Sequence, residues 1–231
     1  MHTRIVPSSG TSLPVIGCGT WRGFDVGSQP AQLPRRADVL TALFDSGGRV
    51  LDSSPMYGSA EQVVGDLLQV HNLVDWRTHL QTLRAWKAQG RISHIGVTHY
   101  TDSAHAELEQ VLRTEPLDFL QCNYSITDRH ADQRLLPLAA ERGVAVLVNL
   151  PFGGGRSLQQ LHLKPLPQWA AEIGCSSWNQ LLLKFVLSQP AVTCVIPGTS
   201  SPDHMRDNAA AGTGELPGPE FWAGKPAELG F

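Results

Sequence analysis

The fold of this chain is decided by the stretch LDSSPMYGSAEQVVGDLLQVHN, residues 51–72. A strand-like apolar run stands at each end, and a helix-like pattern lies between the two runs. Asp52, Tyr57 and His71 stand at the turn-like breaks beside the runs. In α/β enzymes the polar side chains at strand ends carry the chemistry. The stretch therefore raises the question of an active site.

The same alternation of strand and helix continues along the chain, after an opening hairpin that turns at residues 8–10. The strand candidates are 15–20, 48–53, 67–72, 94–98, 118–123, 144–150 and 192–198. The helix candidates are 33–47, 59–68, 76–90, 103–115, 131–143, 176–189 and 202–212. Alternating helices and continuous apolar strands predict an α/β fold of the TIM-type (β/α) barrel, with a parallel sheet covered by helices. Only seven strands follow the hairpin, one fewer than a complete barrel contains.

The composition limits the number of domains, the class of partner and the location that we expect. The 231 residues are 42% hydrophobic and 17% charged, with a net charge of −3. We expect one domain over 1–231, with 1–14 as a hairpin cap and 212–231 as a C-terminal loop or tail. The charge gives no reason to expect nucleic acid, and no apolar run approaches the roughly 20 residues of a membrane span. The N-terminal residues lack the apolar core of a signal peptide, so we expect a cytoplasmic location.

The cysteines and histidines do not form a metal-binding pattern. The four cysteines are far apart and form no CxxC pair, so we expect buried thiols. The nine histidines form no HxH or HExxH motif. A metal-dependent barrel hydrolase is disfavoured for that reason, and no metal is expected.

Asp52, Tyr57 and His71 suit the reduction of a carbonyl group. A phenol has a reference pKa of about 10, and it becomes a useful proton donor when a neighbouring cation or histidine stabilises its anion. Each residue alone also has an ordinary alternative. A tyrosine before glycine is commonly a packed turn residue, and a histidine at a strand end is commonly a hydrogen-bonded core group.

Six segments occur in the order typical of the aldo-keto reductase superfamily. They are GTW (19–21), LDSSPMYGSAEQVVG (51–65), QVHN (69–72), GRISHIGVTHY (90–100), LQCNYS (120–125) and IPGTSSPDHMRDNAAA (196–211). The chain resembles this superfamily over nearly its whole length. The resemblance implies that Asp52, Tyr57 and His71 are three members of a catalytic tetrad. Tyr57 would donate a proton to the carbonyl oxygen, and His71 would orient the carbonyl and polarise the tyrosine.

The resemblance also implies a cofactor, NADP(H), with NAD(H) as the alternative. The implied contacts are Thr98, His99, Gln121, Asn149, Phe152, Gly153, Gly154, Arg156, Gly198, Thr199, Ser200, His204 and Asn208. Thr98 and His99 stand where the family usually has Ser and Asn against the nicotinamide carboxamide. The run GGGR at 153–156 suits close approach to a pyrophosphate, although a flexible loop is equally typical of such a run.

The segment that would bind the adenosine end of the cofactor departs from the family pattern at two positions. Thr199 and Ser200 can hydrogen-bond a 2′-phosphate at a helix N-terminus. Gly198 stands where many members carry a lysine, and His204 where they carry an arginine. Losing two fixed cations weakens phosphate binding, because charge-assisted hydrogen bonds are the strong ones.

The fourth tetrad member, a lysine on the third barrel strand, has no counterpart here. The first lysine after Tyr57 is Lys87, and Asp52 and His71 are only 19 positions apart. A βα unit of a barrel takes about 31 residues, so one unit, strand three with helix three, is missing. Residues 66–68 fit both the end of a helix and the start of a strand. Our hypothesis is that an in-frame deletion joined two similar stretches here.

The loss has structural and chemical consequences. Seven strands must either close with a strained register or leave open edges, which favour self-association. Asp52 loses its cationic partner and tends to take up a proton. The sequence therefore predicts an NAD(P)H-dependent oxidoreductase that reduces small aldehydes or ketones, impaired by the missing lysine. The alternative is a nucleotide-binding pseudoenzyme or a non-functional shortened family member. Trp21 and Trp76 are candidates for an apolar substrate pocket, and packing is their equal alternative.

Overall fold

The computed structural model describes residues 1–21, 24, 33–54 and 67–231, and for residues 33 and 67–71 the backbone alone. It opens with a hairpin of β1 (Thr3–Ile5) and β2 (Ser12–Pro14), which pair antiparallel. Gly10 turns the hairpin at a φ of +72°, a value that glycine adopts without steric cost. The hairpin predicted around residues 8–10 is confirmed.

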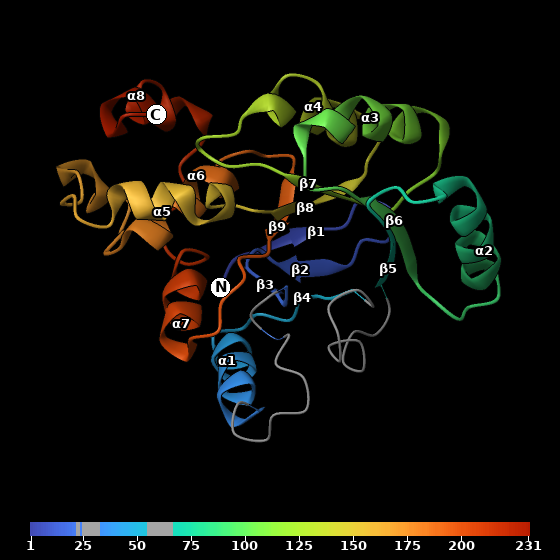
Figure 1. Cartoon of the computed structure of the whole chain (residues 1–231), viewed down its shortest axis with the longest axis horizontal. Helices are drawn as coiled ribbons and strands as arrows, with labels where there is room; N and C mark the ends of the chain where they lie inside the picture. The colour runs from blue at the N-terminus through green and yellow to red at the C-terminus, as the bar shows by residue number, and fades with distance from the viewer. Residues whose placement is uncertain (22–23, 25–32, 55–66) are drawn as a thin grey trace.

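In the described residues, seven parallel strands follow the hairpin, at the seven predicted places. They are β3 (Cys18–Gly19), β4 (Leu51–Asp52), β5 (Leu67–His71), β6 (His94–Thr98), β7 (Phe119–Asn123), β8 (Ala145–Asn149) and β9 (Val192–Val195). Strands β5 to β9 form one sheet in chain order, and β3 pairs with β4. Parallel bridges from Ile16 to Val195 and from Gly19 to Gly198 join β3 to β9. The strands therefore follow one another in the order β4, β3, β9, β8, β7, β6, β5 (Figure 1).

The barrel is not closed in the part of the chain that the structure describes. No described hydrogen-bonded pair joins β4 to β5, so these strands are the two ends of the series. This break is where the third strand of a TIM-type barrel would stand. The predicted fold class, a barrel-like α/β fold that lacks one βα unit, is confirmed.

Helices cover the strands and agree largely with the predicted pattern. They are α1 (Leu33–Asp45), α2 (Trp76–Ala88), α3 (His105–Thr114), α4 (Leu135–Glu141), α5 (Arg156–Leu161), α6 (Trp178–Leu187), α7 (Pro202–Ala210) and α8 (Lys225–Leu229). Of the helix expected at 59–68, most lies outside the described residues. Leu67 and Leu68 belong to β5, so the strand prevails over the helix at this junction.

Two segments expected as loops contain short helices. Helix α5 follows the glycine run at 153–155, which is itself a 3₁₀ turn. The tail forms a 3₁₀ turn at Pro219–Trp222 and then α8. Aromatic packing accounts for the order of the tail. Trp222 is buried against Trp169 and Phe185, with ring centroids 5.8 and 5.5 Å away.

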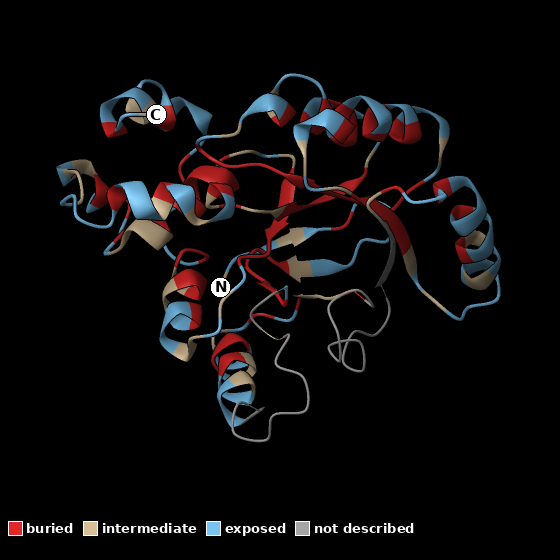
Figure 2. Cartoon of the chain, viewed as in Figure 1, coloured by how far each residue is buried: buried red, intermediate tan, exposed pale blue. Residues whose placement is uncertain are grey.

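The core lies between the strands and the inner faces of the helices (Figure 2). Helix α6 is buried from Gln180 to Leu187 because it packs between β9 and neighbouring helices. Its one charged residue, Lys184, donates to the carbonyl oxygens of Ile173, Thr213 and Glu215 at 2.5 to 3.0 Å. A buried ammonium group requires such partners. Lys184 therefore ties the start of the tail to the core.

The four cysteines are free and buried, as the sequence predicts. Burial raises their pKa values, that of Cys175 to about 11, so the thiols stay protonated at neutral pH. In the described part of the chain, no helix combines the length and the apolar character that crossing a membrane requires.

Candidate functional site

A cavity of about 530 Å³ opens at the carboxyl ends of the strands. Eleven of the residues proposed from sequence line it: Trp21, Asp52, Thr98, Gln121, Asn149, Phe152, Gly154, Gly198, Thr199, His204 and Asn208. They come from both halves of the chain. The strand arrangement thus brings them together although the sequence separates them.

Three of the strand-end positions lie in one row across neighbouring strands. Thr98 on β6 is the register partner of Gln121 on β7, and the backbone of His71 on β5 is the register partner of Thr98. Parallel strands in register place their carboxyl ends at the same edge. The side chain of His71 and the whole of Tyr57 lie outside the described residues, so their proposed roles stay predictions.

Asp52 occupies the end of β4 at the cavity. Its backbone carbonyl accepts hydrogen bonds from the backbone N–H and the hydroxyl of Thr20, at 3.0 and 2.7 Å. Burial raises the pKa of its carboxyl group to about 6, and a hydrogen bond with the side chain of Gln121 opposes that rise. No described residue forms an ion pair with Asp52. The described site thus offers this carboxyl group an amide partner and no cation.

Two amide oxygens in the cavity wall are buried without a hydrogen-bond partner among the described residues. They are Oε1 of Gln121 and Oδ1 of Asn149. The Nδ2 group of Asn149 donates to the backbone carbonyl of His99 at 3.2 Å, which fixes the direction of its free oxygen. A buried acceptor without a donor costs about 1–3 kcal/mol. The cavity therefore suits a ligand that brings N–H groups.

His99 lies beside the cavity and does not line it. Its Nδ1 accepts hydrogen bonds from the backbone N–H groups of Tyr100 and Thr101, at 3.0 and 3.2 Å, and its ring stacks on that of Tyr100. Burial lowers its pKa, so the ring is neutral at neutral pH. Because Nδ1 already accepts two hydrogen bonds, a contact with a bound ligand would have to come from Nε2.

The glycine run forms the rim of the cavity. Gly153, Gly154 and Gly155 have φ values of +59°, +69° and +92°, which L side chains rarely adopt. Gly154 and Gly155 line the cavity, whereas a Cβ on Gly153 would meet Oγ1 of Thr127 at 2.8 Å. Arg156 begins α5 and does not line the cavity. The run is therefore a specific turn whose backbone faces the cavity.

The loop from β9 to α7 forms the other end of the cavity. Thr199 lines it, and its hydroxyl oxygen accepts from the backbone N–H of Ser201, which caps α7. Asn208 lines it too, and its Oδ1 accepts from Nδ2 of Asn179 at 3.1 Å. Ser200 does not line the cavity.

The two tryptophans proposed to line a substrate pocket have different environments. Trp21 lines the cavity and is half exposed. Trp76 is buried at the start of α2, where its indole N–H donates to Oε1 of Glu107 at 3.0 Å. The structure therefore places Trp76 in the core, away from the cavity.

Sequence reasoning missed several residues in the cavity lining: Asn72, Tyr100, Leu150, Pro151, Leu158 and Asn179. Asn72 and Leu150 directly follow β5 and β8, and both have positive φ values, +53° and +47°. Each is the last residue of a predicted strand, and this position at the carboxyl end is the signal that could have identified them. Asn179 lies on α6, and no sequence signal marks it.

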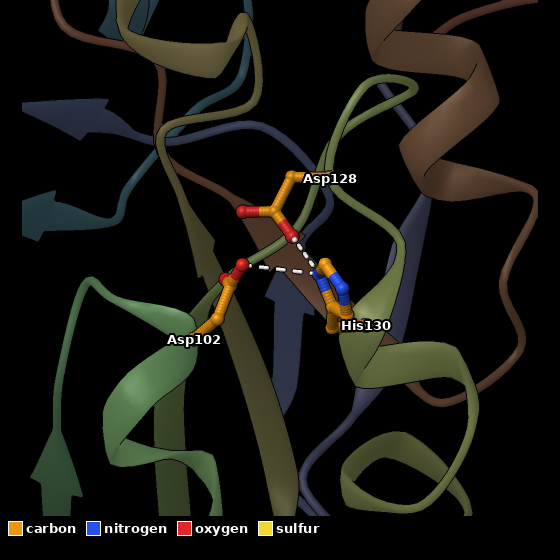
Figure 3. Close-up of side chains that lie close together, drawn as sticks. All are labelled: Asp102, Asp128 and His130. Atoms are coloured by element: carbon orange, nitrogen blue, oxygen red, sulfur yellow. Dashed lines mark hydrogen bonds and ion pairs between the residues drawn. The ribbon is translucent and has the colours of Figure 1, made fainter.

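A second polar cluster lies near the carboxyl end of β7 (Figure 3). The amide nitrogen of Asn123 donates to Asp102 and to Asp128, at 2.5 Å each, and Nε2 of His105 lies 3.0 Å from its oxygen. Nδ1 of His130 lies 3.0 Å from Asp102 and 3.3 Å from Asp128. The ligand atoms of Asp102, Asp128 and His130 lie within 4.8 Å of one another, a spacing compatible with binding one metal ion. The hydrogen bonds between them account for the arrangement without an ion.

Residues 66–221 match the model of the aldo/keto reductase family. Among curated proteins, the chain is 32% identical over 132 residues to pyridoxine 4-dehydrogenase of Escherichia coli (strain K12), covering 57% of this chain and 43% of that protein. It is 29% identical over 155 residues to the NADH-specific methylglyoxal reductase of the same organism, covering 56% and 46%. The matches thus cover less than half the length of these relatives.

Solved structures resemble the fold over almost the whole chain. A holo aldo-keto reductase from Bacillus halodurans has a TM-score of 0.75 at 19% identity, covering 99% of this chain and 96% of that one. An aldo-keto reductase from Klebsiella pneumoniae in complex with NADPH has a TM-score of 0.73 at 20% identity, covering 99% and 94%.

Proposed function

The chain belongs to the aldo/keto reductase family, and from this premise we propose that it is an NAD(P)H-dependent oxidoreductase that reduces small aldehydes or ketones to alcohols. Its turnover is impaired by the loss of the tetrad lysine. We infer a single domain over 1–231 that acts in the cytoplasm.

The observation that carries the proposal is a pair of oxygens in the cavity wall, Oε1 of Gln121 and Oδ1 of Asn149, for which the described residues provide no hydrogen-bond donor. The carboxamide of a nicotinamide ring brings two N–H donors and one acceptor. Its N–H groups would donate to these two oxygens, and the hydroxyl of Thr98 would donate to the carboxamide oxygen. The residues present therefore fit a nicotinamide cofactor.

NADP(H) is the proposed cofactor, and NAD(H) is the alternative. A structural relative was solved with NADPH, and a curated relative is an NADH-specific enzyme. At the other end of the cavity, Thr199 supplies a hydroxyl at the N-terminal turn of α7, beside Ser200. A helix N-terminus favours an anionic group such as a phosphate.

A bound cofactor of this kind would supply a hydride to the carbonyl carbon. Gln121, Asn149 and Thr98 would hold the carboxamide of its ring, and Phe152 would offer an aromatic surface for stacking. The backbone of Gly154 lines the cavity beside the expected pyrophosphate. Tyr57 donates the proton to the carbonyl oxygen, with His71 as the orienting residue. These two roles rest on the family resemblance.

Asp52 explains why we propose an impaired enzyme. Its described surroundings hold no cation, and burial raises its pKa to about 6. In the intact tetrad, a lysine next to the aspartate would lower the pKa of the tyrosine. Assisted proton transfer is typically worth about 10²–10⁴ in rate, and this chain loses part of it. The same observation favours a second candidate function, a pseudoenzyme or non-functional shortened member that binds the nucleotide without turnover.

Two measurements on the same sample separate these functions. Quenching of tryptophan fluorescence reports NADPH binding, and the loss of absorbance at the reduced nicotinamide band with a generic aldehyde reports turnover. Binding with slow turnover supports the impaired reductase, and binding without turnover supports the pseudoenzyme. Absence of binding contradicts both. Insertion of a lysine-bearing strand and helix between β4 and β5 should raise the turnover rate of a reductase.

We also propose self-association through the ends of the strand series. Strands β4 and β5 each pair with one described neighbour only, and an open edge offers hydrogen-bonding groups to another chain. Sedimentation velocity over a hundredfold range of protein concentration tests this, and a monomer throughout would contradict it.

A further inference from the structure

Two arginines of helix α1 converge on the loop that forms the adenosine end of the cavity. Nε of Arg35 donates to the backbone carbonyl of Ser200 at 3.2 Å, and Nη1 of Arg36 lies 3.5 Å from the same oxygen. Helices α1 and α7 lie side by side (Figure 1), so the contact joins residues 165 positions apart in the chain. Ser200 directly follows Thr199, which lines the cavity.

The arginine pair adds positive charge where the sequence lacks it. Gly198 and His204 provide no permanent charge at this end of the cavity. Arg35 is exposed, and it forms no ion pair with any described residue. Only its Nε is used in the contact with Ser200. A guanidinium group carries five N–H donors, so the two terminal nitrogens of Arg35 retain four.

Two acidic groups of α7 interact with other side chains. On α7, Asp203 pairs with Arg206 at 2.7 Å, and Asp207 accepts from Ser177 and Gln180. The first turn of α7 adds backbone N–H groups and the positive end of the helix dipole. The local field therefore favours a dianion such as a phosphate monoester.

We propose that Arg35 and Arg36 bind the 2′-phosphate of NADP(H) and so determine the preference for the phosphorylated cofactor. This inference rests on the proposed function. The planar guanidinium group suits phosphate because it can donate two parallel N–H bonds. The pair on α1 thereby replaces, from another part of the fold, the two cations that the β9–α7 loop lacks.

The test compares nucleotide fragments that differ only in this phosphate. Calorimetry measures the affinity for 2′,5′-ADP and for 5′-AMP, and fluorescence quenching measures NADPH and NADH. In the full chain, Arg35→Ala/Arg36→Ala should weaken 2′,5′-ADP and NADPH at least about tenfold. The same variant should change 5′-AMP and NADH less than about threefold, since these ligands do not reach the arginines. Arg113→Ala, which removes an exposed arginine on α3, is the charge-matched control and should change none of the four.

The outcomes separate this inference from the proposed function. Equal loss of all four ligands, or no loss of any, would overturn the inference while leaving nucleotide binding intact. A wild-type chain that binds none of the four would overturn both. Circular dichroism checks that the double variant folds, and the variants Arg35→Lys and Arg36→Lys provide a second test if it does not. Lysine retains the positive charge but lacks the planar pair of N–H donors of the guanidinium group. Binding of 2′,5′-ADP should therefore weaken less than with alanine, and it should stay sensitive to salt.

Discussion

The carboxyl group of Asp52, on β4, shares a hydrogen bond with the side-chain amide of Gln121, on β7. The two strands lie far apart in the strand order, so the contact crosses the interior of the strand series. Gln121 is thus a hydrogen-bond partner of a carboxyl group that has no cation among the described residues. It also keeps its own Oε1 free at the cavity.

Asp52→Asn should stabilise the fold at high pH. Burial raises the pKa of Asp52 from about 3.8 to about 6, so the folded state binds its proton more tightly than the unfolded state. The contribution of the neutral carboxyl to stability is complete below the unfolded-state pKa and is lost as pH rises through about 6. Asparagine does not ionise. The variant should therefore gain on the order of 2–3 kcal/mol over wild type at pH 8 and about 1 kcal/mol at pH 4.5, measured by urea unfolding. A difference that does not vary with pH would contradict the assigned shift.

Gln121→Met should weaken NADPH binding by about tenfold, because methionine removes the acceptor proposed for the carboxamide and keeps a similar volume. Loss of the hydrogen bond to Asp52 should raise the pKa of that carboxyl further. Fluorescence titration measures the affinity. Gln110→Met, an exposed position on α3, is the matched control and should bind NADPH as the wild type does. Equal NADPH affinity of the two variants would show that Gln121 does not contact the cofactor.

Asn123→Ala should destabilise the protein by about 2–4 kcal/mol at pH 7. Its amide joins Asp102, Asp128 and His105, and without it two carboxylates face each other. Although burial raises the pKa of Asp102, the hydrogen bond donated by Asn123 and the nearby His130 help to leave it lowered. The stability from such a group is present above its unfolded pKa and is lost as pH falls.

The penalty of Asn123→Ala should accordingly shrink as the pH falls below about 3.8. Thermal unfolding at pH 7 and at about pH 3 measures it, and Gln81→Ala, an exposed amide on α2, provides the control. A penalty that grows with acidity would indicate that the carboxyl groups do not depend on the amide.

Removal of residues 225–231 should loosen helix α5. The tail holds this helix through Gln160, which donates to the carbonyl of Gly230 at 3.2 Å, and through Lys164, which donates to that of Leu229 at 3.4 Å. Each such bond is worth about 1 kcal/mol. Amide hydrogen exchange in 156–161 should therefore accelerate by about tenfold or more.

Because α5 directly follows the glycine turn, the truncated chain should also release NADPH faster. Exchange in α1, which is remote from the tail in sequence, should stay unchanged. Uniform acceleration throughout the chain would instead indicate general loss of stability.

The sequence predicted the elements of the fold because their signals are local. Apolar strands, amphipathic helices and the turn at Gly10 depend on neighbours a few positions away. The missing unit was also visible, since the distance between Asp52 and His71 is too short for another strand and helix. The ordered tail was not predicted, because its order depends on the packing of Trp222 against Trp169 and Phe185.

The chain by itself therefore determined the seven strands, most of the described helices and their order, and which βα unit is absent. Only the tertiary structure decided which side chains meet. It assigned Leu67 and Leu68 to a strand and buried Trp76 in the core. It also turned the ring of His99 toward the backbone N–H groups of Tyr100 and Thr101. It also joined Asp52 to Gln121, and Arg35 to Ser200. The physical reason is that these contacts depend on strand register and helix packing between distant segments, which no local pattern encodes.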